Sequence, residues 1–314
     1  MARTREIKKR IKAVGNIRRI TKTMQMIATA KFAAAQARAV ATKPYTEGVF
    51  DLVMELGANL AKGGGDFTHP LISGAGPAAE KAPELLLVIT SDRGLCGAYN
   101  GSVLRAAMAH IRKAQGAGRD LSIELVGRKG LAFLRYNNLP IAHAHSLGDK
   151  PTFQEVERLA QQYMDRFTRG EISGVRVAFM KFLSAGRQAP TVMQLLPLQA
   201  PEKKEAPAPG PGAPGAPGAS SAQPAEADAV TYEFSPSAPE LLGDLLPAAV
   251  KATLFQAVND AIVSEHVARM IAMKAATDNA GKMGKLLTRK YNRARQAQIT
   301  TELTEIVTGA AALE

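Results

Sequence analysis

Hydrophobic side chains recur every three or four residues through the N-terminal part of the chain. The positions that form this repeat are Ile7, Ile11, Val14, Ile17, Ile20, Met24 and Ile27. A narrow apolar stripe of this kind is typical of a helix that pairs with another helix in a coiled coil. Gly15 costs such a helix about 1 kcal/mol relative to alanine, and Pro44 is expected to bend or break it. We therefore predict a long helix over residues 1–62 and a Gly-rich linker over 63–83.

The period changes in the middle of the chain, where short apolar runs alternate with helical segments. Strands are predicted at 84–90, 121–126, 141–146, 175–183 and 191–198. Helices are predicted at 100–115, 129–136 and 152–169, the last of them capped by Thr152. Such alternation indicates a mostly parallel sheet, and the two final strands, which follow each other directly, indicate a hairpin. Residues 84–200 and 230–238 are therefore predicted to form a Rossmann-like α/β domain.

A helical period returns near the end of the chain, over residues 239–314. Its apolar positions are Leu241, Leu242, Leu245, Leu246, Val250, Leu254, Val258 and Ala261, and later Ile299, Leu303, Ile306, Ala310 and Leu313. A helix of about 70 residues is about 105 Å long, which is far longer than a globular domain requires. We predict an antiparallel coiled coil of the N- and C-terminal helices with the α/β domain inserted between them. The longer C-terminal helix should then protrude alone at one end.

Residues 201–229 differ from the rest of the chain in composition. This segment holds seven of the 18 prolines, is rich in Ala and Gly, and lacks aromatic and large aliphatic residues. Such a segment cannot bury enough apolar surface to fold, so we predict a disordered insertion.

The net charge of +12 is concentrated at the two ends of the chain. Residues 1–48 contain 12 Lys and Arg against 2 acidic residues, and residues 248–314 contain 9 against 6. The partner of these ends is therefore expected to be acidic: nucleic acid, an anionic membrane surface or an acidic protein ring. The single cysteine, Cys96, excludes an internal disulfide. No apolar stretch approaches the length of about 18 residues that a membrane-spanning helix needs.

Several polar groups of the middle region could carry chemistry. Residues 91–94 (Ser-Asp-Arg-Gly) and 127–130 (Gly-Arg-Lys-Gly) follow predicted strands, where open α/β sheets often bind ligands. Neither contains a phosphate-binding fingerprint, so plain turns are favoured over a small-molecule site. His143 and His145 share one face of a strand, but two ligands are too few for a structural metal site. Cys96 is interpreted as a small buried thiol.

Two features of the terminal helices suggest a binding role. A basic face comprises Arg3, Arg5, Lys8, Lys9, Arg10, Lys12, Arg18, Arg19 and Lys22. Only Glu6 is acidic in this part of the chain, whereas a helix face that is merely exposed to solvent would contain both acidic and basic residues. The second feature is the tract 293–302. At helical spacing it brings together Arg295, Gln298 or Thr301, and Glu302, near the line along which the two helices meet. These residues are either a contact region or ordinary coiled-coil residues. A coiled-coil nucleic-acid-binding protein and an α/β enzyme remain as alternatives, but no recognition module, base or nucleophile is recognisable.

Three separated blocks carry a resemblance to a known family. They are residues 5–45, which include Ile20-Thr21-Lys22-Thr23-Met24, residues 89–100 (Ile-Thr-Ser-Asp-Arg-Gly-Leu-Cys-Gly-Ala-Tyr-Asn), and residues 273–280 with 295–312. In this order they resemble the N-terminal helix, the start of the α/β domain and the C-terminal helix of gamma subunits of F-type ATP synthases. The resemblance covers nearly the whole chain except 201–229.

This resemblance implies a central rotor stalk, coupling proton flow through a c ring to ATP synthesis or hydrolysis and regulating the ATPase. The paired helices would lie inside a ring of alpha and beta subunits, and the α/β domain would contact the epsilon subunit and the c ring. The chain itself would hold no catalytic residue, cofactor or metal, and would bind no nucleic acid. Its place would be peripheral, on the cytoplasmic face of the bacterial inner membrane.

The resemblance also implies specific contact residues. Those matching the family's contact region with the beta subunit are Lys22, Met24, Arg295, Gln296, Thr300 and Glu302. The tip that would sit in an apolar sleeve of the ring contains Val307, Gly309, Ala310, Ala311 and Leu313. Chloroplast-type members carry a regulatory cysteine pair in an insertion of the middle domain. The insertion here contains no cysteine, so we predict that thiol regulation is absent.

Overall fold

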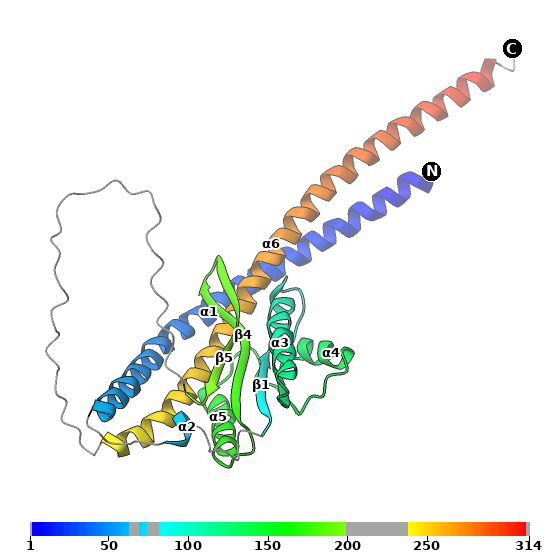
Figure 1. Ribbon diagram of the computed structural model, residues 1–314. Coiled ribbons are helices and arrows are strands. Elements are labelled where there is room, and N and C mark those ends of the chain that lie inside the picture. Colours follow the sequence, from blue (N-terminus) through cyan, green and yellow to red (C-terminus); the bar gives the residue numbers. More distant parts are fainter. Residues whose placement is uncertain (1, 63–68, 74–81, 199–237, 312–314) are drawn as a thin grey trace, which may run out of the picture.

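Two long helices and an α/β domain packed against them make up the molecule (Figure 1). The computed structural model describes residues 2–62, 69–73, 82–198 and 238–311. The predicted insertion at 201–229, the strand-like segment at 230–237 and Leu313 lie outside the described residues. Within the described residues, the arrangement confirms the predicted fold class of a coiled coil with an inserted α/β domain.

The coiled coil consists of α1 (Ala2–Lys62) and α6 (Ala238–Ala311). The two helices run antiparallel, so that both ends of the chain lie at the same end of the molecule (Figure 1). Helix α1 continues through Pro44 and α6 through Pro247 without a break. Core packing on both sides of each proline, at Ala39 and Val49 in α1 and at Leu246 and Val250 in α6, stabilises each helix despite the missing N–H donor. A short helix, α2 (Pro70–Ser73), follows α1.

The sheet has five strands: β1 (Glu84–Ile89), β2 (Leu121–Val126), β3 (His143–His145), β4 (Gly174–Ser184) and β5 (Arg187–Leu196). Their order is β3-β2-β1-β4-β5. Neighbouring strands are parallel except β4 and β5, which form the expected antiparallel hairpin. Strand β3 is shorter than the predicted 141–146 because it pairs with only three residues at the end of β2.

Helices cover both faces of this sheet. They are α3 (Tyr99–Gly116), α4 (Arg128–Tyr136) and α5 (Phe153–Thr168). Central strand β1 is buried on both sides, because its successive side chains point to opposite faces. Leu86 and Val88 pack on α3, whereas Leu85 and Leu87 belong to the larger core that includes α5, α6 and α1. We call the two long helices α1 and α6 the shaft. The shaft and the α/β domain therefore share one hydrophobic core.

The first half of α6 is a core helix of the α/β domain. Leu246, Val250 and Leu254 are fully buried, and Val258 is 1% exposed. Among the described helices, α6 alone is long and apolar enough to cross a membrane by length and composition, although the sequence predicted none. Its most apolar window is 44% buried inside the protein, as is usual for a helix that supplies part of a core.

The start of α5 offers a direct test of a local sequence prediction. The Thr152 hydroxyl accepts a hydrogen bond from the Glu155 backbone N–H, while the Glu155 carboxylate accepts one from the Thr152 backbone N–H at 2.8 Å. We expect Thr152→Ala to lower the free energy of unfolding by about 1 kcal/mol, because this reciprocal cap is lost. Urea unfolding of the full chain measures the change, with Thr168→Ala as the control at the other end of the helix. A loss no larger than in that control would contradict the capping role.

Candidate functional site

The coiled-coil part of α1 and α6 is the candidate functional region, and its seam follows a regular heptad. The half-buried or buried positions on α6 are spaced alternately three and four residues apart: Thr277, Ala280, Gly284, Leu287, Tyr291, Ala294 and Gln298. The matching positions on α1 are Thr4, Ile7, Ile11, Val14, Thr21, Gln25 and Ala28. Alternate steps of three and four are the signature of a left-handed supercoil. A supercoiled pair resists twisting better than a single helix would.

The predicted apolar stripe on α1 is wrong at three positions. Ile17, Ile20 and Ile27 are 52%, 57% and 53% exposed, so they lie off the seam. Each step of three residues falls about 60° short of a full helical turn. Three such steps in succession carry the apolar residues away from α6. The seam instead continues through polar Thr21, which hydrophobicity alone could not identify.

Polar contacts fix the register of the two helices. The hydroxyl oxygens of Thr21 and Thr277 lie 2.8 Å apart. Near the outer end, the Thr4 hydroxyl donates to the Gln298 side-chain oxygen at 3.1 Å. Closer to the α/β domain, the Thr42 hydroxyl donates to Gln256 at 3.0 Å. Hydrogen-bonding side chains at seam positions disfavour slipped alignments, which would leave these groups without partners.

The predicted contact residues lie at two separate levels of the shaft. Lys22 is exposed and Met24 half-buried, close to the level of Thr277. The other four are all exposed on α6 around the level of Thr4: Arg295, Gln296, Thr300 and Glu302. Seventeen residues of α1 separate the two levels, a distance of about 26 Å along the helix axis. As the sequence indicated, Glu302 and Gln298 lie together, with a 2.8 Å hydrogen bond from the Gln298 amide.

The outer end of α6 extends beyond α1 as a single helix (Figure 1). Every residue from 301 to 309 is exposed, including the hydrophobic side chains of Leu303, Ile306 and Val307. A Cβ atom added at Gly309 would meet no other atom within 4 Å. Residues 310 and 311 are helical, and Leu313 lies outside the described part of the chain.

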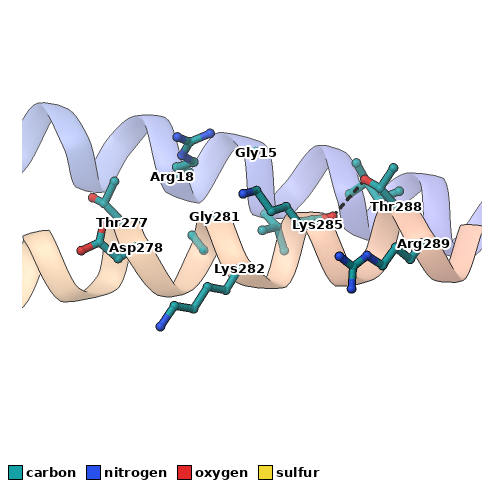
Figure 2. A pocket seen from close by; sticks show the side chains of 13 residues that line it. Gly15, Arg18, Thr277, Asp278, Gly281, Lys282, Lys285, Thr288 and Arg289 are labelled. Atoms are coloured by element: carbon teal, nitrogen blue, oxygen red, sulfur yellow. Dashed lines mark hydrogen bonds between the residues drawn. The ribbon is translucent and has the colours of Figure 1, made fainter.

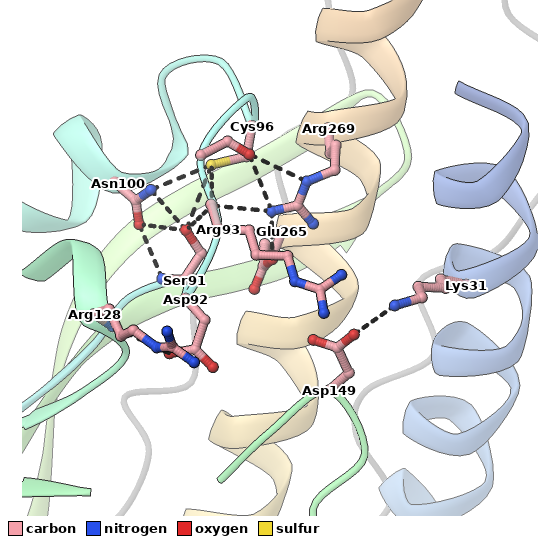
Figure 3. A network of polar contacts seen from close by, with 11 residues as sticks. Lys31, Ser91, Asp92, Arg93, Cys96, Asn100, Arg128, Asp149, Glu265 and Arg269 are labelled. Atoms are coloured by element: carbon pink, nitrogen blue, oxygen red, sulfur yellow. Dashed lines mark hydrogen bonds and ion pairs between the residues drawn. The ribbon is translucent and has the colours of Figure 1, made fainter. Parts of the chain in front are cut away.

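Polar contacts that the sequence did not predict join the shaft to the α/β domain (Figure 3). Arg269 of α6 forms a 2.7 Å ion pair with Glu265 and donates to the carbonyls of Arg93 and Gly94 at 3.1 and 3.4 Å. On the other side, Lys31 of α1 forms a 2.5 Å ion pair with Asp149. Partners separated by more than 100 residues leave no periodic signal in a sequence. The single clue was Glu265 and Arg269 at helical i, i+4 spacing.

The ligand-binding position of an open α/β sheet is filled by the protein itself. The sheet order places the topological switch between β1 and β4, and Val258 and Ile262 of α6 line the same small cavity as Ile89 at the end of β1. Hydrogen bonds hold the loop after β1 in place. The Ser91 N–H donates to the Asn100 side-chain oxygen, and the Ser91 hydroxyl donates to the Arg93 carbonyl. The cavity beside this loop measures about 30 Å³, room for about one or two water molecules. Cys96 beside this loop is buried, as predicted.

A buried carboxylate organises the edge of the sheet near the predicted histidine pair. Glu124 is 4% exposed and accepts hydrogen bonds from Tyr163 at 2.8 Å and Arg166 at 2.8 Å, with His145 at 2.7 Å. The rings of His143 and His145 lie 4.8 Å apart. Among the described residues, no group of three metal-ligating side chains comes together. The sequence signal for this cluster was a charged residue, Glu124, inside the mostly apolar strand β2.

The Glu124 cluster predicts a pH dependence. Burial alone would raise the pKa of Glu124, but hydrogen bonds from His145, Tyr163 and Arg166 lower it to about 2. A carboxyl group whose folded pKa is depressed stabilises the fold above its unfolded value, near 4.5, and this contribution is lost as the pH falls toward 2. We expect Glu124→Gln to lower the free energy of unfolding by about 1–3 kcal/mol at neutral pH. Urea unfolding of the unchanged chain and of the Glu124→Gln variant, between pH 7 and acidic pH, measures this difference. A difference in the free energy of unfolding that stays constant as the pH falls would contradict it.

Comparisons with known proteins match the whole chain. A profile of the family described as ATP synthase matches residues 3–313. The ATP synthase gamma chain of Rhodopirellula baltica is 38% identical over 316 residues, and that of Methylibium petroleiphilum is 38% identical over 314, with 100% of both chains covered in each case.

Solved structures share the fold. A rotor chain of the Euglena gracilis mitochondrial ATP synthase gives a TM-score of 0.58 at 18% identity, covering 95% of this chain and 99% of that one. A central stalk and c-ring structure from Tetrahymena thermophila gives a TM-score of 0.55 at 20% identity, covering 82% and 99%.

Proposed function

This chain belongs to the family of ATP synthase gamma chains, and we propose on that basis that it is the central rotor stalk of a membrane-associated ATP synthase. It couples ion flow through a c ring to ATP synthesis or hydrolysis in a ring of alpha and beta subunits. The chain itself catalyses no reaction. Its role is mechanical, since it transmits rotation between two sites of chemistry and transport that other subunits provide.

The observation that carries this proposal is the exposed shaft. Helix α6 has 74 residues, and its outer half leaves the domain core and presents large hydrophobic side chains to solvent. The exposed fractions are 61% at Leu303, 71% at Ile306 and 58% at Val307. Exposed apolar surface of this kind indicates a partner. In the complex, the surrounding subunits cover these side chains, which the other described residues of this chain leave exposed.

Two sets of residues contact that ring in our proposal. The beta subunit meets the set Lys22, Met24, Arg295, Gln296, Thr300 and Glu302, whose exposed polar groups are free to exchange partners as the shaft turns. Exposed ion pairs contribute only about 0–1 kcal/mol each, so contacts of this kind break and reform without deep energy wells. The apolar sleeve surrounds the tip set Val307, Gly309, Ala310, Ala311 and Leu313.

The α/β domain forms the foot of the stalk, next to the epsilon subunit and the c ring. The complex holds the chain at the cytoplasmic face of the bacterial inner membrane as a peripheral subunit. The strong positive charge of residues 1–48 supports acidic neighbours within the ring.

Purification of the complex from native membranes tests the proposal. We expect the chain to co-purify with nucleotide-binding alpha and beta subunits, and we expect vesicles depleted of it to lose ATP-driven proton pumping. Re-adding the chain should restore pumping. The rotor function would be refuted if the alpha and beta subunits purify without this chain and vesicles that lack it pump protons equally well.

A further inference from the structure

A cavity of about 450 Å³ lies at the β3 edge of the sheet. Its lining comes mainly from β2, β3 and α5, and no residue of α1 or α6 contributes to it. The cavity between those two long helices (Figure 2) belongs instead to the surface that the proposed function already assigns to the surrounding subunits. None of the predicted contact residues lines the β3 cavity, so it is a separate feature of the α/β domain.

Two imidazole rings face this cavity together. His143 and His145 both line it, and their ring centroids lie 4.8 Å apart. They share one face of β3, because side chains two residues apart on a strand point the same way. A ring nitrogen binds Zn²⁺ at about 2.0–2.1 Å, so two rings at this separation can reach the same ion. His143 forms no hydrogen bond or ion pair within the described residues, and its nitrogens are therefore free for a ligand.

Glu124 determines which nitrogen of His145 is available. Its carboxylate is held by Arg166 and Tyr163, both at 2.8 Å, and its Oε2 lies 2.7 Å from Nε2 of His145. An ionised carboxylate can only accept, so Nε2 carries the proton and Nδ1 of the neutral ring keeps its lone pair. Nδ1 has no hydrogen-bond partner in the part of the chain that the structure describes. A carboxylate behind a histidine is the usual way in which proteins orient a metal-binding imidazole.

The fixed charges around the cavity admit a cation. Two carboxylates and two guanidinium groups line it: Glu124, Asp165, Arg166 and Arg169. Glu171 beside the cavity pairs with both arginines, at 3.8 and 3.2 Å. Three carboxylates against two guanidinium groups leave one net negative charge while the histidines are neutral. An anion would be repelled by this charge and would meet arginines that already have partners, whereas a cation would be attracted.

We propose that His143 and His145 bind one divalent transition-metal ion, with Glu124 as the positioning residue behind His145. Imidazole nitrogen suits Zn²⁺, Ni²⁺ and Cu²⁺, whereas Mg²⁺ prefers oxygen ligands. No group of three metal-ligating side chains comes together among the described residues, so water completes the coordination. The sequence argued only against a structural site, which is closed by four protein ligands, and this open site exchanges its ion with the medium. The bound ion restrains β3, which pairs with β2 over only three residues.

Isothermal titration calorimetry of the full chain with Zn²⁺ at neutral pH tests the proposal. We expect one ion to bind per chain, and we expect no binding of Mg²⁺. His143→Gln should abolish Zn²⁺ binding, and because His143 is exposed, this change leaves the fold intact. Glu124→Gln should weaken binding about 10–100-fold. Electron spin echo spectra of that variant loaded with Cu²⁺ should still show two coordinated imidazoles, since Glu124 is not a ligand.

His110→Gln is the matched control. His110 also lies beside a buried carboxylate, Glu84 at 3.4 Å, but its ring contacts no second histidine ring within the described residues. This variant should bind Zn²⁺ as the unchanged chain does. A folded chain that binds no Zn²⁺, or that binds it equally well after His143→Gln, would overturn the proposal. So would an equal loss of affinity in His110→Gln. The outcome does not depend on the rotor function, because the chain is titrated alone.

Discussion

Replacing Arg269 with alanine is expected to lower the free energy of unfolding by about 3–5 kcal/mol. The guanidinium is the partner of Glu265 at 2.7 Å, and it also donates to the carbonyls of Arg93 and Gly94. The Arg269 and Glu265 side chains are only 10% and 13% exposed. Removal of the arginine therefore takes the cationic partner from a buried carboxylate and one donor from each loop carbonyl, although the Arg93 carbonyl still accepts from the Ser91 hydroxyl at 2.7 Å. Urea unfolding of the full chain gives the loss in stability.

A double variant separates the ion pair from simple packing. Burial raises the pKa of Glu265, whereas the nearby Arg269 charge lowers it. Arg269→Met combined with Glu265→Gln removes both charges and keeps the volume, so it should recover most of the stability lost in Arg269→Ala. Hydrogen exchange in residues 91–97 should increase in the single variant, because Arg269 holds this loop against α6. An unchanged exchange rate would show that Arg269 does not anchor the loop.

Gly127→Ala is expected to lower the free energy of unfolding by about 3 kcal/mol or more, through steric overlap and backbone strain. A Cβ atom at Gly127 would lie 2.2 Å from the carbonyl oxygen of Thr90, and the residue has a φ of 93°. Hydrogen bonds resist a separation of β1 from the start of α4, because the Thr90 hydroxyl donates to the Val126 carbonyl at 2.9 Å and accepts from the Gly130 N–H at 3.0 Å. Thermal unfolding of the purified chain measures the effect.

Gly148→Ala is the matched comparison for this variant. Gly148 has a similar positive φ, 64°, but a Cβ atom there would meet nothing within 4 Å. It should therefore show only the backbone strain of the left-handed region, about 1–2 kcal/mol. Equal losses in the two variants would mean that the close approach to Thr90 contributes nothing.

The fold could be predicted because the sequence changes its hydrophobic period. Apolar residues spaced three and four apart at both ends indicated paired helices, and buried runs such as residues 84–89 indicated parallel strands. The Thr152 cap was also recognisable, because a capping box is a local arrangement that needs only residues three apart. These signals depend on near neighbours in the chain.

The exact seam of the coiled coil and the contacts between the shaft and the α/β domain could not be predicted in the same way. Hydrophobicity selected Ile17 and Ile20, but the helix geometry carries them away from α6 and leaves Thr21 on the seam. The Lys31–Asp149 pair joins residues 118 positions apart, and only the folded topology brings them together. Gly15 and Gly284 likewise line one cavity although they belong to opposite ends of the sequence, and only the register of the two helices brings them together.

Direct observation of rotation tests the rotor function most directly. Tyr136 is 87% exposed at the end of α4, whereas the natural Cys96 is buried, so Tyr136→Cys provides one reactive site for a bead on the foot. With the alpha and beta ring of the purified complex fixed to a surface, addition of ATP should turn the bead continuously in one direction. A bead that stays at a fixed angle while the same ring hydrolyses ATP at its full rate would contradict the account.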